Sequence, residues 1–161
     1  MIFEREELTS PVANGLLSAL NAELTAEYPQ AGATHFSLDR DEVAPGEGAF
    51  VVGRWAGSPV ACGAVRCLRS ARLVRELGEN AGELKRMYVV PEFRGRGISH
   101  QLLQHLEDEA RALGVHRLVL ETGARQLAAL ALYERAGFTR IPLYGEYAGS
   151  PETSVCMSKA L

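Results

Sequence analysis

Residues 87–100 read MYVVPEFRGRGISH, and this stretch carries the most informative pattern in the chain. An apolar run ends at Pro91, the turn RGRG occupies 94–97, and an amphipathic helix is expected to follow. Glycines let a backbone approach a ligand closely, and successive N–H groups at a helix N-terminus bind anions. The two arginines add positive charge that suits a phosphorylated ligand. The stretch therefore predicts a strand, a phosphate-binding turn and a helix, in that order.

The letters of this turn exclude two common phosphate motifs. A Walker A loop requires Gly-x-x-x-x-Gly-Lys followed by Ser or Thr, which does not occur in the sequence. The dinucleotide pattern Gly-x-Gly-x-x-Gly fails because position 100, three residues after Gly97, is a histidine. The turn instead resembles the acyl-CoA-binding pattern Arg/Gln-x-x-Gly-x-Gly/Ala of the GNAT superfamily of N-acetyltransferases. Arg94 and Gly97 match that pattern, and Ser99 stands where the family usually has Gly or Ala.

A second stretch, LYERAGF at residues 132–138, resembles the closing motif of the same family, a helix that carries Leu-Tyr-Glu and ends in Gly-Phe. Both motifs occur in the family's order, and the resemblance covers roughly residues 48–161. It implies a mixed α/β fold with a GNAT-like central sheet. The N-terminal half of this sheet would be antiparallel, a parallel strand pair would splay apart after it, and helices would flank it.

Composition is that of one ordinary globular domain, expected to span residues 1–161. Of the 161 residues, 47% are hydrophobic and 23% are charged, which argues against disorder. The net charge of −3 gives no support for nucleic-acid binding. No stretch approaches the ~18 apolar residues of a membrane span. The acidic N-terminus lacks a secretory apolar region. We therefore expect a cytoplasmic protein without a nucleic-acid or membrane partner.

Hydrophobic periodicity and turn residues predict the elements. Ser10 and Pro11 read as the N-cap and first position of a helix that Tyr28-Pro29 ends. Residues 30–47 are expected to form a loop near the active site, 56–59 a hairpin turn, and 70–80 no defined element. We expect strands near 2–5, 49–55, 60–68, 83–90, 117–122 and 155–160, and helices over 11–28, 98–113 and 125–136.

The resemblance also implies catalytic roles. An alkylamine with a pKa near ~10 is mostly protonated at pH 7, so acetyl transfer needs a base, and the leaving thiolate benefits from an acid. Glu83, on the strand before the turn, would be the general base, acting through a water. Glu121, at the end of the neighbouring strand, is the alternative base and would face the same cleft. Tyr133 would be the general acid that protonates the coenzyme A thiolate.

The family's acetyl-CoA site maps onto two further groups of residues. The backbone before the turn would pair with the pantetheine arm and offer an N–H to the thioester oxygen, and the turn and helix start would hold the pyrophosphate. Gln126, where the family usually has asparagine, and Arg125 are further candidates. The backbone positions are Met87, Tyr88 and Val89, and the pyrophosphate positions are Arg94, Gly95, Arg96, Gly97, Ile98 and Ser99.

The acceptor site is less well marked. Arg66 lies near the end of one expected strand, and Arg86 lies within the next. Two guanidinium groups would suit a carboxylate-bearing acceptor such as an amino acid. Strand alternation places Lys85 on the opposite face from Arg86. The alternative for both arginines is exposure, or ion pairing with Glu83 or Glu121 inside the sheet.

Three residues of the loop after Phe138, namely Tyr144, Glu146 and Tyr147, are further acceptor-site candidates because such loops often line a substrate mouth.

The expected activity is direct transfer of an acetyl group from acetyl-CoA to the primary amine of a small molecule, in a ternary complex. No cysteine stands beside an obvious histidine base, which argues against a covalent intermediate, and the four histidines show no metal-binding spacing. The alternatives are a protein or peptide amine as acceptor, a non-catalytic acyl-CoA-binding regulatory module, and a nucleotide-phosphate binder. Homodimers are common in the family, and the sequence neither supports nor contradicts one here.

Overall fold

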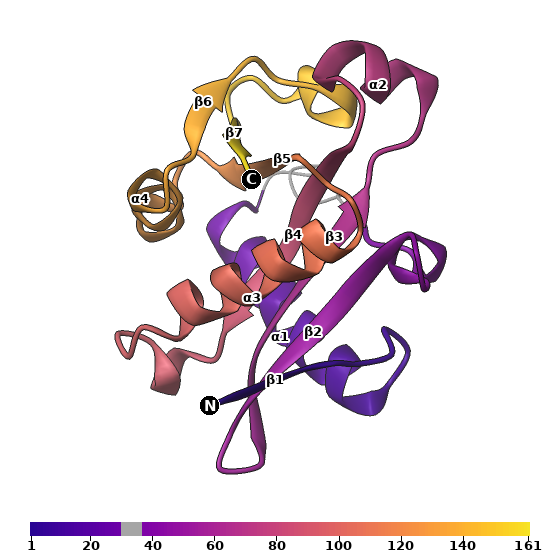
Figure 1. Ribbon diagram of the computed structural model, residues 1–161. Coiled ribbons are helices and arrows are strands. Elements are labelled where there is room, and N and C mark those ends of the chain that lie inside the picture. The colour runs from indigo at the N-terminus through magenta and orange to yellow at the C-terminus, as the bar shows by residue number, and fades with distance from the viewer. Residues whose placement is uncertain (30–36) are drawn as a thin grey trace.

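The computed structural model describes residues 1–29 and 37–161, and these residues build one mixed sheet with helices on both faces (Figure 1). The strand order is β1-β2-β3-β4-β5-β7-β6. Strands β1 to β4 are antiparallel neighbours, and β4 and β5 are parallel, which confirms the predicted architecture. The strands are β1 (Ile2–Arg5), β2 (Gly48–Trp55), β3 (Ser58–Cys67), β4 (Ala81–Val89), β5 (Arg117–Gly123), β6 (Thr139–Ile141) and β7 (Ser154–Ala160).

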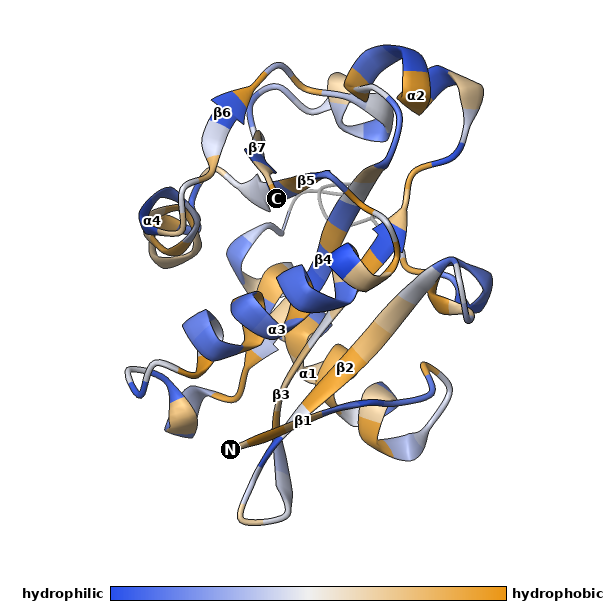
Figure 2. Ribbon diagram, in the orientation of Figure 1, coloured by the Kyte–Doolittle hydropathy of each residue, from blue (hydrophilic) through white to orange (hydrophobic). Residues whose placement is uncertain are grey.

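Helices cover the two faces of the sheet and bury separate clusters. On one face α1 packs on an apolar cluster that includes Phe50 and Tyr88, whereas α3 and α4 pack on the other over Leu84 and Val89. Figure 2 shows the hydrophobic strand β2 in the sheet, and α3 presenting a largely hydrophilic surface to the viewer. The helices are α1 (Pro11–Glu27), α2 (Ala71–Leu77), α3 (Ile98–Ala112) and α4 (Leu127–Arg135), and short 3₁₀ helices are η1 (Arg40–Val43), η2 (Pro91–Phe93) and η3 (Gly145–Gly149).

The ends of α1 follow the predicted signals. The Ser10 hydroxyl accepts a hydrogen bond from the Ala13 N–H at 3.0 Å, and Pro11 occupies the first turn, where its missing N–H leaves no bond unmade. The helix ends at Tyr28, whose N–H reaches the Leu24 carbonyl. The Tyr28 hydroxyl then accepts the Arg125 N–H at 2.8 Å, so this helix end is fixed to the start of α4. A Cβ at residue 123 would overlap the Tyr28 ring, which explains Gly123.

Turns between the elements also match the sequence. Ala56 and Gly57 both have positive φ, as a two-residue turn between β2 and β3 requires. Gly97 (φ +74°) stands directly before α3, and Gly114 (φ +78°) follows its end. The buried positions of α3 recur at helical spacing, from Ile98 through Leu102 to Leu106.

Three features differ from the sequence predictions. Residues 71–77, in the segment left undefined, form α2, where the Ser70 hydroxyl accepts the Leu73 N–H. The three-residue strand β6 was not predicted and pairs with β7. Within the predicted loop 30–47, residues 40–43 form η1, while 30–36 lie outside the described residues. Among the described helices, none has the length and apolarity needed to span a membrane.

Candidate active site

The parallel strands β4 and β5 separate part-way along their length and leave a cavity between them. Their pairing ends at Leu84 and Leu120, and a cavity of about 150 Å³ lies beyond that point. The walls come from β4, from β5 with the turn that follows it, from α1, from α4 and from η3. These walls include Leu20, Leu24, Tyr28, Leu84, Lys85, Arg86, Met87, Glu121, Thr122, Gly123, Gln126, Ala129, Tyr133 and Tyr147. Beyond Leu84, β4 pairs with β3 on one edge and has left β5 on the other.

A β-bulge in β4 sets which side chains reach this cavity. Cys62 pairs with Tyr88 and Ala64 with Lys85, so β4 contributes one extra residue to that interval. Arg86 lies in the bulge with φ +59°, a conformation that non-glycine residues rarely adopt. On the opposing strand, a Cβ at Gly63 would lie 2.7 Å from Leu106 and would also crowd Met87.

The bulge corrects the expectation that Lys85 and Arg86 lie on opposite faces. The Arg86 guanidinium contacts the Asn21 side chain on α1, and the Lys85 ammonium donates to the Ser37 carbonyl at 2.7 Å. Both residues line the cavity. Simple alternation fails here because the extra residue reverses the order of side chains after Lys85.

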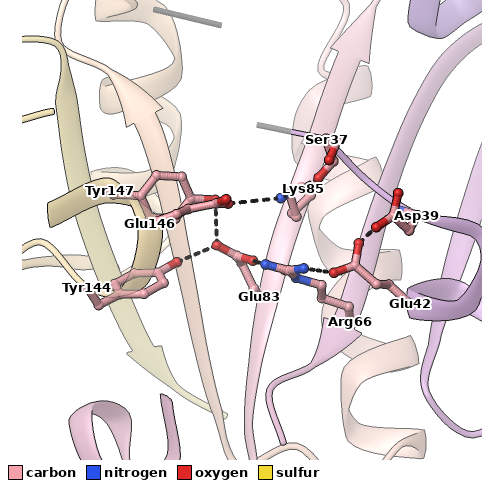
Figure 3. Close-up of polar contacts among 9 residues, drawn as sticks. All are labelled: Ser37, Asp39, Glu42, Arg66, Glu83, Lys85, Tyr144, Glu146 and Tyr147. Atoms are coloured by element: carbon pink, nitrogen blue, oxygen red, sulfur yellow. Dashed lines mark hydrogen bonds and ion pairs between the residues drawn. The ribbon is translucent and has the colours of Figure 1, made fainter. Parts of the chain in front are cut away.

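Glu83 is the centre of a buried polar network (Figure 3). Its side chain is 0% exposed, and both carboxylate oxygens accept hydrogen bonds. The hydroxyls of Tyr144 and Tyr147, in or beside η3, each donate to Oε1 at 2.7 Å. Arg66 donates to Oε2 through Nε at 2.7 Å and through Nη2 at 2.6 Å. The carboxylate is therefore fully engaged by protein donors.

The same network extends to η1 across β3. The Arg66 Nη1 contacts the Glu42 carboxylate, and Glu42 in turn accepts the Asp39 N–H at 2.8 Å. Burial, followed by the negative charge of Glu83, raises the pKa of the Tyr144 and Tyr147 hydroxyls, which keeps both protonated as donors.

Glu121 lies on the same face of the sheet in a different environment. It is half-buried and lines the cavity. Burial raises the pKa of its carboxyl to about 7, and the nearby charge of Glu83 adds to this effect. At neutral pH the Glu121 carboxyl can therefore both accept and release a proton.

Tyr133 reaches the cavity from α4, which packs on the same face of the sheet as α3. Its hydroxyl lies 3.5 Å from the Met87 sulfur, and its ring packs edge-on against Phe138 with ring centroids 5.7 Å apart. Burial raises the pKa of the hydroxyl, so Tyr133 keeps its proton at neutral pH. Gln126, the residue before α4, lines the cavity, and its side-chain oxygen accepts the Thr122 hydroxyl at 2.9 Å and the Gly123 N–H at 3.1 Å.

The turn before α3 has the geometry of an anion site. Gly95 and Gly97 both have φ +74°, and a Cβ added at either would meet no atom within 4 Å, so their surface is open. The first-turn N–H groups of a helix have no intrahelical acceptors. Arg94 and Arg96 are exposed beside the turn; Arg94 donates to the Val89 carbonyl at 2.9 Å and pairs with Glu23 on α1 at 2.6 Å. These residues fit the phosphates of coenzyme A.

Comparison with known proteins agrees with this geometry. The family model described as "Acetyltransferase (GNAT) family" matches residues 14–138. An IAA acetyltransferase of Azospirillum brasilense is 38% identical over 146 residues, which are 91% of this chain and 88% of that protein. The chain belongs to the GNAT family of acetyltransferases. It is accordingly an acetyl-CoA-dependent N-acetyltransferase.

Solved GNAT structures share the whole fold. A Klebsiella pneumoniae protein assigned to the acyl-CoA N-acyltransferases has a TM-score of 0.80 and 31% identity, covering 99% of this chain and 97% of that one. A GNAT acetyltransferase of Elizabethkingia anophelis, solved with acetyl-CoA bound, has a TM-score of 0.67 at 17% identity and covers 99% and 97% of the two chains.

In this GNAT enzyme most of the predicted site residues lie either around the cavity or in the Glu83 network beside it. Met87, Gln126, Arg86, Glu121, Tyr133 and Tyr147 line the cavity. Arg66 and Tyr144 bond to Glu83, as Tyr147 also does, so Arg66 takes the ion-pairing alternative with Glu83. Ile98 is buried and can offer only its backbone to a ligand.

Strand alternation predicts the wrong face for Lys85, so the sequence alone does not identify it as a residue of this cavity. The available signal was the pair of adjacent cations, Lys85 and Arg86, directly before the splayed segment.

Proposed function

We propose that this GNAT enzyme acetylates the primary amine of a small molecule by direct attack on acetyl-CoA. The observation that carries the proposal is the cavity where β4 and β5 separate, because Glu121 and Tyr133 both line it.

Glu121 is the general base in this proposal, in place of Glu83. All four bonds to the Glu83 carboxylate come from protein donors, and the side chain is fully buried, so it has no access to an incoming amine. Glu121 lines the cavity, and its pKa of about 7 lets it take a proton from an ammonium group near neutral pH. Glu83 then holds Tyr144 and Tyr147 in place.

Tyr133 is the general acid. Its buried hydroxyl stays protonated at neutral pH and faces the cavity beside Met87, so it can donate a proton to the thiolate that leaves. The backbone of residues 87–89 and the turn at 94–99 hold acetyl-CoA through N–H groups and the two arginines.

A covalent acetyl-cysteine does not fit this site. Burial raises the pKa of Cys62 and of Cys156 to about 12, and it raises the pKa of the Cys67 thiol as well. None of the three cysteines lines the cavity. Direct transfer between the two substrates remains as the route.

Thiol release from acetyl-CoA across a panel of small primary amines tests the proposal, with the acetylated product identified by mass spectrometry. We expect release that depends on the amine, and no acetyl label on the protein when acetyl-CoA is added alone. Release that no amine stimulates, or an acetylated protein that then transfers its label, would contradict it.

A further inference from the structure

The cavity carries two adjacent cations that ordinary strand geometry would separate. Lys85 and Arg86 both line it because the bulge turns Arg86 to the α1 side. The bulge places a long, charged side chain at φ +59°, a strained conformation that is kept where the surroundings impose it and that clusters at functional sites.

Among the described residues, Arg86 has no carboxylate within ion-pair distance and Lys85 has only that of Glu146. Burial lowers the pKa of the Lys85 ammonium, and the nearby negative charge of Glu83 opposes that shift. The partner of the Arg86 guanidinium is the Asn21 amide, which carries no charge. Lys85 has a side chain only 4% exposed, donates to the Ser37 carbonyl, and lies 3.6 Å from a carboxylate oxygen of Glu146. The Glu146 side chain is 49% exposed, so it can turn toward solvent when another anion takes its place.

Glu121 supplies the opposite charge in the same cavity. A ligand that complements this arrangement carries an amine for Glu121 and an anionic group for the two cations. A planar carboxylate suits both an ammonium and a guanidinium donor, and such charge-assisted hydrogen bonds are stronger than those between neutral groups.

We propose that Lys85 and Arg86 form an anion subsite that selects acceptors bearing a carboxylate beside the primary amine, as α-amino acids do. The inference rests on the proposed function. From the sequence, the carboxylate of the acceptor is expected to bind Arg66 and Arg86; here it binds Lys85 and Arg86. Arg66 is engaged by Glu83 and Glu42. The subsite positions the amine of the acceptor against Glu121.

The test uses matched sets of three acceptors: an α-amino acid, its amide and its decarboxylated amine. The readout is the ratio of kcat/KM for the acid to kcat/KM for the amide. Because both values come from the same protein, effects of a substitution on folding and on overall activity cancel in the ratio. The proteins are the wild type, Lys85→Met, Arg86→Gln and Lys85→Arg. Arg111→Gln is the charge-matched control, because Arg111 lies on α3, on the other face of the sheet.

The wild type should favour the acid by about tenfold or more. Lys85→Met and Arg86→Gln should each lower that preference by about tenfold, Lys85→Arg should restore most of it, and Arg111→Gln should leave it unchanged.

The inference and the proposed function fail in different ways. If the wild type acetylates amides and decarboxylated amines as well as acids, or if both variants keep the preference, the subsite is refuted while acetyl transfer to amines stands. If no member of any set stimulates thiol release, the proposed function fails and the subsite with it.

Discussion

Two glutamates on neighbouring strands differ in what their carboxylates touch. Glu83 is surrounded by donors, namely Arg66, Tyr144 and Tyr147, whereas Glu121 borders a cavity and has a pKa of about 7. Of the two carboxylates, the one that an incoming amine can reach is that of Glu121, because Glu83 is fully buried and bonded to protein donors.

Glu83→Gln should lower the free energy of unfolding by about 2 kcal/mol, because the amide offers N–H groups to the Arg66 guanidinium and leaves Glu42 as its one carboxylate partner among the described residues. Urea unfolding measures the change. Glu47→Gln is the matched control, since it breaks an exposed ion pair with Arg69 and should leave stability unchanged. A Glu83→Gln protein as stable as wild type would show that the network contributes little.

Tyr133→Phe should reduce kcat about 100-fold and leave the Kd for acetyl-CoA unchanged, because the ring keeps its packing against Phe138 and only the proton donor is lost. Thiol release measures kcat, and calorimetric titration measures the Kd for acetyl-CoA. A full rate in this variant would remove Tyr133 from the mechanism.

At the scale of elements, most of the sheet and helices could be predicted from the sequence because their signals are local. Ser10-Pro11 begins α1, Gly97 and Gly114 bound α3, and the apolar strands have clear periodicity. The three residues of β6 carry too little pattern, and their position depends on pairing with β7.

The candidate site was only partly predictable. The turn at 94–97 and the Leu-Tyr-Glu motif can both be recognised in the sequence, and they identify the candidate anion-binding turn and Tyr133. The faces of Lys85 and Arg86 cannot be predicted in this way, because they depend on a bulge in the pairing of β3 with β4. The sequence also does not decide whether Arg66 faces the acceptor or forms an ion pair with Glu83, as it does in the structure.

Gly97→Ala should weaken acetyl-CoA binding by about fivefold or more and destabilise the protein by about 1 kcal/mol, because φ +74° is unfavourable for alanine and relaxing it moves the N–H groups of the turn. Calorimetric titration with acetyl-CoA and thermal unfolding measure both. The control is Gly15→Ala in the exposed part of α1, where the Cβ meets no atom within 4 Å and affinity should not change. Equal affinity of Gly97→Ala and wild type would exclude the turn from cofactor binding.

Across the whole molecule, buried charge connects segments that are distant in sequence. The chain of contacts from Glu42 through Arg66 and Glu83 to Tyr147 joins η1, β3, β4 and η3 around one side of the cavity (Figure 3). These polar contacts add to apolar packing, which is present on both faces of the sheet.

Global stability should depend on the protonation of Glu121. Its pKa is raised by burial from an unfolded value near 4.5 to about 7, so between these values the folded state binds more protons than the unfolded state. Stability therefore falls as pH rises from about 4.5 to 7, by about 2–3 kcal/mol from this group. Urea unfolding at pH 5 and pH 7.5 should show a smaller loss for Glu121→Gln than for wild type. Parallel losses in the two proteins would contradict the raised pKa.

The most direct test of Glu121 as general base in an acetyltransferase is the pH dependence of kcat/KM for one reactive amine, in wild type and in Glu121→Gln. The ionised carboxylate is the active form, so the wild-type value should rise with pH through an apparent pKa of about 7 and then level off. Glu121→Gln should be about 100-fold slower or more at pH 7.5 and should lack that step, keeping only the rise that follows the amine's own pKa. A Glu121→Gln profile with the same step near pH 7 and a comparable rate would contradict the account.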